Sequence, residues 1–138
     1  MRVYVAAALV DAPAVRAVQD WARSVGHEVV HDWTSAADAE VRDYLAEPDA
    51  SARIASTDLR AVLEADLVVV LATGAPARGL YVELGAALAC VERGEAKEVV
   101  VVGEGLGDSV FFQHPAVQRA PSVEEWWALR VSRSIGRP

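Results

Sequence analysis

Cysteine, basic residues and long hydrophobic runs are all scarce in this chain of 138 residues. The single cysteine, Cys90, excludes an internal disulfide and is compatible with a reducing compartment. Acidic residues outnumber basic ones by 20 to 13, and the net charge of −7 argues against a nucleic-acid-binding surface or an anionic membrane partner. No apolar run approaches the ~20 residues that a membrane span needs, and no signal-peptide pattern opens the chain. We therefore expect a cytoplasmic protein.

Residues that could hold a metal or a dinucleotide are also few. His27, His31 and His114 are too scattered in the sequence to form a metal site. The glycines of the segment 103–107 lack the strand, loop and helix context of a dinucleotide fingerprint. Cys90 has no evident activating partner, which favours a role as a small core residue. We expect neither a metal nor a cofactor.

The stretch from Leu67 to Cys90 organises the rest of the chain. It opens with an apolar, β-branched run over 67–72, which has the length of a strand buried on both faces. A loop with Gly74 and Pro76 interrupts it, and apolar residues at helical spacing resume after Gly79. This strand, loop and helix form half of a parallel α/β unit, and ligands of such sheets bind outside the carboxyl ends of the strands.

Short apolar runs alternate with segments of helical apolar spacing along the whole chain, and this pattern predicts alternating strands and helices. A single doubly wound parallel five-stranded sheet is expected, flavodoxin-like, with order 2-1-3-4-5 and helices on both faces. The domain is assigned to residues 1–131 and a frayed tail to 132–138. The segment 38–50 is expected to be a short helix and loop, and the segment 109–114 to be extended. Strands are predicted at 2–8, 27–31, 67–72, 98–102 and within 115–120, and helices at 11–26, 52–65, 79–93 and after the capping Ser122.

Glu83 is the carboxylate that stands closest to the expected ligand edge. It falls near the start of the helix that follows the central strand, where the backbone dipoles favour an ionised carboxylate. An ionised carboxylate beside a crevice can attack an anomeric carbon and form a glycosyl ester, as in retaining glycoside hydrolysis. The alternative is that Glu83 only stabilises the start of the helix.

Asp58 is anomalous because it lies within the apolar face of its predicted helix, midway between Ile54 and Val62. A carboxylate in such a place needs partners or a wet cavity, because burying it unpaired costs several kcal/mol. Asp58 could be the acid that protonates a leaving group. Alternatively, the segment 56–58 breaks the helix and Asp58 caps its continuation.

Three motifs in this order resemble a known family. They are Tyr4 in the first strand, Asp58 in the pattern Ile54-x3-Asp58-x3-Val62, and Gly79-x3-Glu83-Leu84-Gly85-x-Ala87. Together they resemble the nucleoside 2-deoxyribosyltransferase family, which includes the deoxynucleoside monophosphate N-hydrolases. The resemblance covers most of the chain, roughly from residue 3 to residue 102.

The resemblance implies a set of catalytic roles. Glu83 would be the nucleophile at C1′ of a nucleoside, Asp58 would protonate the leaving base, and Tyr4 would hydrogen-bond Glu83 and hold it in line. The implied activity is cleavage of an N-glycosidic bond or transfer of a (deoxy)ribosyl group, and the implied assembly is a homo-oligomer. Two alternatives stay open: an inactive nucleotide-binding or regulatory module, and an NAD-type N-glycohydrolase.

The sequence identifies the substrate-binding residues less clearly than the catalytic residues. The transferases usually carry an Asp six residues before the nucleophile, where this chain has Ala77. The monophosphate hydrolases carry a Gly-Ser-Ile-Arg-Gly type phosphate loop after the first strand, where this chain has the segment 7–11 without a comparable nest of amides and hydroxyls. Arg78 could replace one of these groups or simply be solvated, and Trp33 could stack on a base or plug the sheet edge. The expected substrate contacts are Ala6, Ala7, Trp33, Arg78 and Gly79.

Overall fold

The computed structural model describes residues 1–35 and 41–136 and is built on one parallel sheet. The observed order is β2-β1-β3-β4-β5, and every neighbouring pair is parallel. The flavodoxin-like α/β class and the order 2-1-3-4-5 are thus confirmed. The strands are β1 (Arg2–Ala6), β2 (Glu28–Val29), β3 (Leu67–Leu71), β4 (Glu98–Val102) and β5 (Val117–Ala120).

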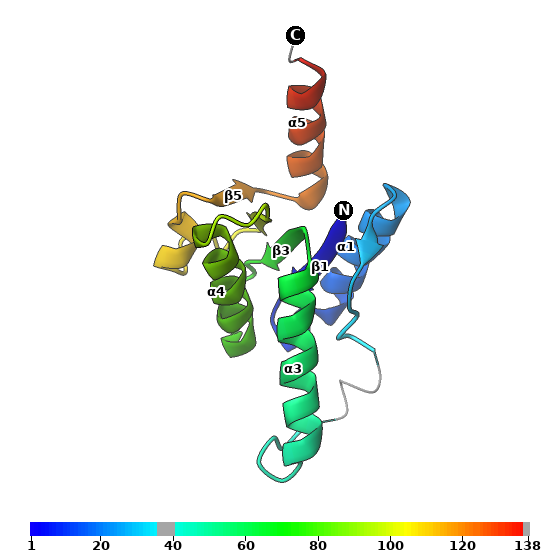
Figure 1. Cartoon of the computed structure of the whole chain (residues 1–138), viewed down its shortest axis with the longest axis vertical. Helices are drawn as coiled ribbons and strands as arrows, with labels where there is room; N and C mark the ends of the chain where they lie inside the picture. Colours follow the sequence, from blue (N-terminus) through cyan, green and yellow to red (C-terminus); the bar gives the residue numbers. More distant parts are fainter. Residues whose placement is uncertain (36–40, 137–138) are drawn as a thin grey trace.

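The helices are arranged around the sheet, and most of α5 extends beyond it, away from α3 and α4 (Figure 1). Helices α3 and α4 pack against each other over one face, where Tyr4 of β1 reaches α4. Helices α1 and α5 meet on the opposite face through Trp21 and Trp127, whose rings lie 6.1 Å apart. The helices are α1 (Ala12–Ser24), α3 (Pro48–Glu64), α4 (Arg78–Glu92) and α5 (Val123–Ile135), with short 3-10 turns η1 (Leu9–Asp11) and η2 (Val110–Gln113).

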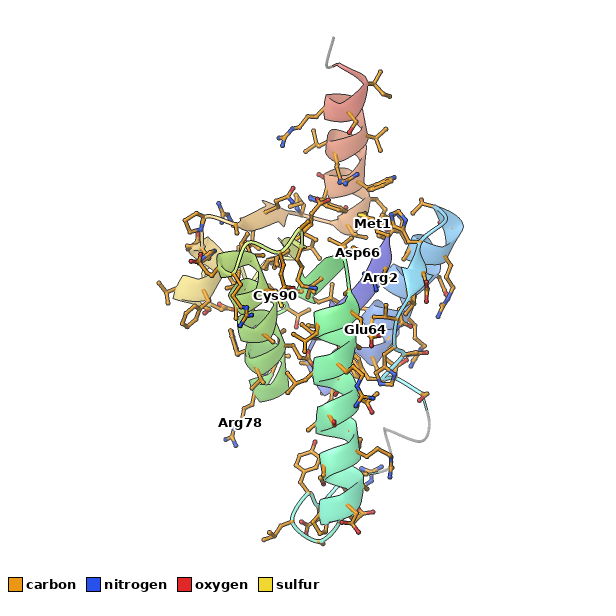
Figure 2. The ribbon with its side chains drawn as sticks, in the orientation of Figure 1. Met1, Arg2, Glu64, Asp66, Arg78 and Cys90 are labelled. Carbon is orange, nitrogen blue, oxygen red and sulfur yellow. The ribbon has the colours of Figure 1, made fainter. Side chains whose placement is uncertain are left out.

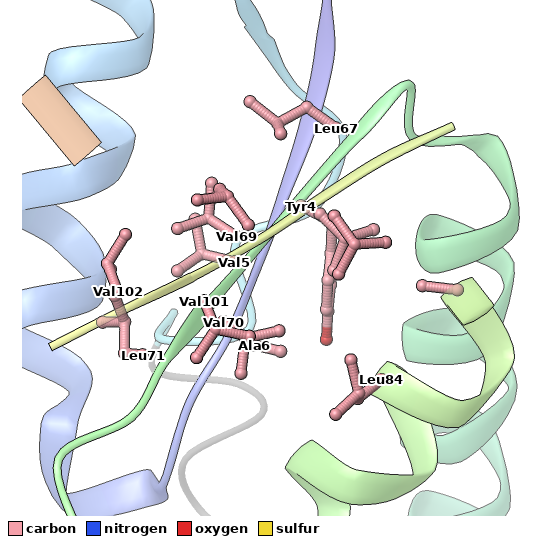
Figure 3. Packing of buried hydrophobic residues seen from close by; sticks show 14 of the residues in the cluster. Tyr4, Val5, Ala6, Leu67, Val69, Val70, Leu71, Leu84, Val101 and Val102 are labelled. Carbon is pink, nitrogen blue, oxygen red and sulfur yellow. The ribbon is translucent and has the colours of Figure 1, made fainter. Parts of the chain in front are cut away.

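The core is centred on β3, in which all five residues are buried. Because strand residues alternate, β3 presents Val68 and Val70 to one layer of helices and Val69 to the other. Figure 3 shows this division, with Tyr4 and Leu84 on the side of α3 and α4 and Val102 on the other side. A strand buried on both faces reads as a continuous apolar run, which explains why this element was predicted within one residue of its observed end.

Three expectations about local structure were wrong. Residues 110–113 form the turn η2 and not an extended segment, because the Ser109 hydroxyl accepts a hydrogen bond from the Phe111 backbone N–H and starts the turn. Helix α3 begins at Pro48 and not at 52, since proline suits the first position of a helix. Helix α5 continues beyond the expected boundary at 131 to Ile135, and the hydroxyls of Ser132 and Ser134 bond to carbonyls one turn back.

Other boundaries differ by small amounts. Strand β1 ends at Ala6, and β2 is limited to Glu28 and Val29, because β2 is an edge strand with a single partner. The cap of α5 by Ser122 is confirmed, since its Oγ accepts a hydrogen bond from the Glu125 N–H. Residues 38–40 of the expected helix and loop over 38–50 lie outside the described residues. Within the described residues, no helix has both the length and the apolar character needed to cross a membrane.

Asp11 does not cap its helix as expected. It occupies the residue before α1, but its side chain makes no capping hydrogen bond. Its Oδ2 atom instead accepts a hydrogen bond of 2.6 Å from the Thr73 hydroxyl. This contact joins the loop after β1 to the loop after β3, at the place where the connections of two neighbouring strands leave toward opposite faces of the sheet.

Lys97 closes the opposite edge of the sheet by capping α3. Its Nζ donates to the backbone carbonyls of Val62, Leu63 and Ala65, which end the helix without intrahelical partners. A cation at a helix C-terminus also opposes the negative end of the helix dipole. Lys97 therefore links α3 to the start of β4.

Replacing Lys97 with methionine should lower the free energy of unfolding by about 1–2 kcal/mol, because the three carbonyls lose a charged donor. Urea titration followed by circular dichroism measures this change. Arg53→Met, which removes an exposed cation from the same helix, serves as the control and should change stability by less than ~0.5 kcal/mol. Equal urea midpoints of unfolding for Lys97→Met and Arg53→Met would contradict the capping role of Lys97.

Candidate active site

Tyr4 and Glu83 meet between the sheet and helix α4. The Tyr4 hydroxyl donates a hydrogen bond of 2.9 Å to Oε1 of Glu83. Tyr4 comes from the middle of β1 and is fully buried, while Glu83 lies in the second turn of α4 and is half-buried. The contact joins two elements that are far apart in the sequence, so it exists only when β1, β3 and α4 are assembled.

The protonation preference of Glu83 differs from the expectation. The helix dipole was expected to favour the ionised carboxylate, but burial raises the pKa of Glu83 to about 8. The Tyr4 hydrogen bond lowers this pKa and the negative charge of Asp58 raises it, and neither effect exceeds that of burial. Glu83 lies beyond the first turn of α4, where the dipole is weak, and this explains why desolvation prevails.

Asp58 lies on the face of α3 that looks toward this site. Helix α3 is continuous from Pro48 to Glu64, so the alternative in which the segment 56–58 breaks the helix was wrong. The negative charge of Asp58 is close enough to Glu83 to contribute to the raised pKa of that carboxyl group. The packing of α3 against α4 brings them together.

His31 is a further member of the cluster that the sequence analysis considered only as a metal ligand. Its Nε2 atom lies 3.4 Å from Oδ1 of Asp58, and the two side chains are 21% and 19% exposed. His31 follows β2 at the carboxyl edge of the sheet, and that position is the signal that could have drawn attention to it. No three His, Cys, Asp or Glu side chains in residues 1–35 and 41–136 are grouped so as to hold a metal ion.

The expected substrate contacts on the β1 and β2 side lie at the carboxyl edge of the sheet. Ala6 ends β1 and is buried, and Ala7 follows it half-buried. Trp33 is only 9% exposed, and its indole N–H donates to the Val5 carbonyl at 2.8 Å. Trp33 thus closes the sheet edge, and its indole N–H is already hydrogen-bonded to the backbone of β1.

The expected contacts on the α4 side are more open. Arg78 and Gly79 begin α4 and are both exposed, while Ala77 before them is half-buried. Figure 2 shows Arg78 at the free end of α4, with its guanidinium pointing away from the rest of the molecule. The expected set of substrate contacts is therefore spread over the rim and is not gathered around Glu83.

A pocket of about 420 Å³ opens at the carboxyl end of β3. Its walls include the loop 72–77, Leu80 and Tyr81 of α4, and Phe112 of η2, whose ring stacks on Tyr81 at 5.7 Å. Neither Glu83 nor Tyr4 nor Asp58 lines this pocket. The pocket is therefore separate from the cluster of Tyr4, Glu83 and Asp58.

The comparisons with known proteins concern this fold. No family model matches the chain, and no curated protein matches it. Among solved structures, it is similar to the CMP N-glycosidase BcmB of Clostridium botulinum, with a TM-score of 0.55 and 18% sequence identity. The match covers 96% of this chain and 98% of that chain, so it concerns the whole domain. At this identity the likeness shows a shared fold.

The raised pKa of Glu83 has a consequence for stability. Between the ordinary glutamate pKa of 4.5 and the folded value of about 8, the unfolded chain releases a proton that the folded chain retains. Stability is therefore lost as pH rises through this window. Since one pKa unit corresponds to ~1.4 kcal/mol, the loss can reach several kcal/mol.

The variant Glu83→Gln cannot ionise and still offers an oxygen to Tyr4. We expect it to match the wild type near pH 4 and to become progressively more stable than the wild type up to pH 8. Chemical denaturation at a series of pH values measures this difference. The exposed Glu104→Gln serves as the control, and a pH-independent difference between Glu83→Gln and the wild type would contradict the burial of this carboxyl group.

Proposed function

We propose that this protein cleaves the N-glycosidic bond of nucleosides or nucleotides, with Glu83 as the nucleophile. The observation that carries the proposal is the hydrogen bond from Tyr4 to Glu83 beside the second carboxyl group, Asp58. Two carboxyl groups whose environments differ are the usual equipment for glycoside chemistry. The fold shared with a protein described as a CMP N-glycosidase supports the choice of an N-glycosidic bond.

In the proposed first step, the Glu83 carboxylate attacks C1′ and the bond from C1′ to the base nitrogen breaks. Asp58 donates its proton to the departing base, which leaves as a neutral molecule. Tyr4 donates its hydrogen bond to Glu83 and keeps one carboxylate oxygen fixed, so the other is the oxygen that reacts. A glycosyl ester on Glu83 and an ionised Asp58 remain.

In the second step, water or another base attacks C1′ and releases Glu83. Asp58 accepts the proton of the attacking molecule, which restores the starting state. Hydrolysis and transfer differ only in the molecule that attacks. Both outcomes therefore belong to the proposed activity.

The reaction requires one proton shared by the two carboxyl groups. Burial favours a resting state in which Glu83 holds the proton, and the reactive arrangement has the proton on Asp58. Burial raises the pKa of Glu83 to about 8, and the negative charge of Asp58 acts in the same direction. Above that pH the proton is lost, and Asp58 can no longer protonate the leaving base.

The direct test is base release by variants of Glu83. Glu83→Ala should reduce release of free base by at least ~1,000-fold, because the nucleophile is removed. Chromatography of reactions with a panel of nucleosides and their 5′-monophosphates, with and without an acceptor base, measures this. Glu92→Ala, on the exposed face of the same helix, should retain full activity. Wild-type-like turnover by a folded Glu83→Ala would refute the mechanism.

A second test uses the pH dependence. Wild-type kcat/KM should fall as pH rises through about 8, where the pair loses its shared proton. Tyr4→Phe removes a hydrogen bond that lowers the pKa of Glu83, so the alkaline fall of kcat/KM should move to higher pH. The same variant should also lower kcat by about tenfold or more. If the alkaline fall of kcat/KM occurs at the same pH in Tyr4→Phe and in the wild type, the result would argue against direct contact between Tyr4 and the reacting carboxylate.

A further inference from the structure

Helix α4 exposes an uncharged face along most of its length. The exposed residues between its two ends are Gly79, Tyr81, Val82, Gly85 and Ala89. Of these, Val82 is 60% exposed and Tyr81 is 40% exposed. Helices α1 and α3, in contrast, expose charged residues in the middle of the helix, such as Asp20 and Arg60. A helix that is apolar on all sides is normally buried, which sets the outer face of α4 apart.

Five exposed residues of α4 form a single stripe. They recur at alternating intervals of four and three residues, so they follow one another along one side of the helix. They are Arg78, Val82, Gly85, Ala89 and Glu92. The stripe therefore has opposite charges at its two ends and uncharged residues between them.

This stripe is complementary to an antiparallel copy of itself. If two such helices cross at Gly85, residues at equal distances from the crossing face each other across a two-fold axis. Val82 of each copy then meets Ala89 of the other, and Arg78 of each copy meets Glu92 of the other. Figure 2 shows the Arg78 guanidinium pointing away from its own chain, where it is available for such a contact.

The charges at the end of α4 suit an incoming cation. Oε1 of Glu92 lies 3.0 Å from Nε2 of His114, but the Glu92 side chain is 69% exposed and can accept a second donor. Arg93 and Glu95, which follow the helix, offset each other in charge. This end of the helix is therefore net negative, and the helix dipole adds to its attraction for Arg78 of another copy.

Gly85 is unexpected in the middle of an exposed helix face. Glycine in the interior of a helix costs about 1 kcal/mol relative to alanine. A Cβ atom at Gly85 would meet no atom within 4 Å, so no steric contact within residues 1–35 and 41–136 calls for glycine. A second helix crossing at this point would call for it, because glycine allows two backbones to approach closely. Gly85 thus indicates a partner independently of the charges.

Helix α3 extends the apolar surface beside α4. The two helices pack against each other, and α3 exposes Leu63 by 55% and Leu59 by 37%. These two leucines are one helical turn apart and lie on the same face of α3. A stable protein interface usually buries about 800 Å² on each partner, and two adjacent helices are better able to supply this area than one.

We propose that the outer face of α4 is the centre of a homodimer interface, in which the stripes of two copies pack antiparallel about an axis at Gly85. The occupant is a second copy of this chain, because the charges of the stripe are opposite in sign and equidistant from its centre. Glu83 lies on the other side of α4, toward Tyr4, so this dimer leaves the candidate site uncovered. Association is measured without turnover, so this proposal and the proposed function can fail separately.

The first test measures association by sedimentation equilibrium. The wild type should be dimeric at about 100 µM protein. Gly85→Lys brings two positive charges together at the axis and should weaken the dimer by about a hundredfold or more. It should remain folded by circular dichroism, because lysine favours helices and the site is open in the single chain. Ala17→Lys, on the exposed face of α1, should leave the dimer unchanged. A monomeric wild type, or a Gly85→Lys variant that stays dimeric, would overturn the proposal.

The second test exchanges the charges at the ends of the stripe. Arg78→Glu and Glu92→Arg each set like charges opposite each other and should weaken the dimer by about tenfold or more. The double variant restores opposite charges and should recover most of the affinity, which loss of the His114 contact could not explain. Glu92→Ala only removes an exposed ion pair worth at most ~1 kcal/mol, so its dimer should persist. Failure of the double variant to recover affinity would refute the antiparallel arrangement.

Discussion

The hydrogen bond between Tyr4 and Glu83 is the constraint on which the candidate site depends. It crosses from the first strand to the helix after the third, and it holds a carboxyl group that is partly shielded from water. Removing water makes the neighbouring charge of Asp58 more influential than it would be at the surface. The reactivity that we assign to Glu83 therefore comes from its surroundings.

The same constraint explains the role of the rigid elements around it. Tyr4 is anchored by the pairing of β1 with both β2 and β3, and Glu83 belongs to a helix that packs on β1, β3 and β4. Groups carried by such elements keep their separation better than groups on loops. The turn before α1 and the loop after β3, in contrast, are joined to each other by the hydrogen bond from Thr73 to Asp11.

Much of the fold could be predicted because its signals are local. The valine run of β3 and the turn after it identify a buried parallel strand, and the alternation of elements then leaves few possible topologies. Tyr4, Asp58 and Glu83 were chosen from motif order; in the structure Tyr4 donates a hydrogen bond to Glu83, and the charge of Asp58 acts on the pKa of Glu83. The ionisation of Glu83 and the contacts of His31 and Asp11 could not be predicted, because each depends on residues distant in the sequence that only tertiary packing brings near.

The likeness to the CMP N-glycosidase BcmB spans nearly the whole of both chains, although fewer than one residue in five is the same. A parallel sheet of this kind is determined by the pattern of apolar residues more than by their identity, so the scaffold tolerates extensive substitution. Chemistry in such folds is set by a few side chains at the carboxyl edge.

The enclosed carboxyl group of Glu83 also has an evolutionary consequence. At neutral pH it weakens the native state, and a glutamine in its place would fold more readily. Random drift guided by foldability alone would tend to erase an acidic residue at such a position. A lineage that keeps it is under selection for something other than a well-packed interior.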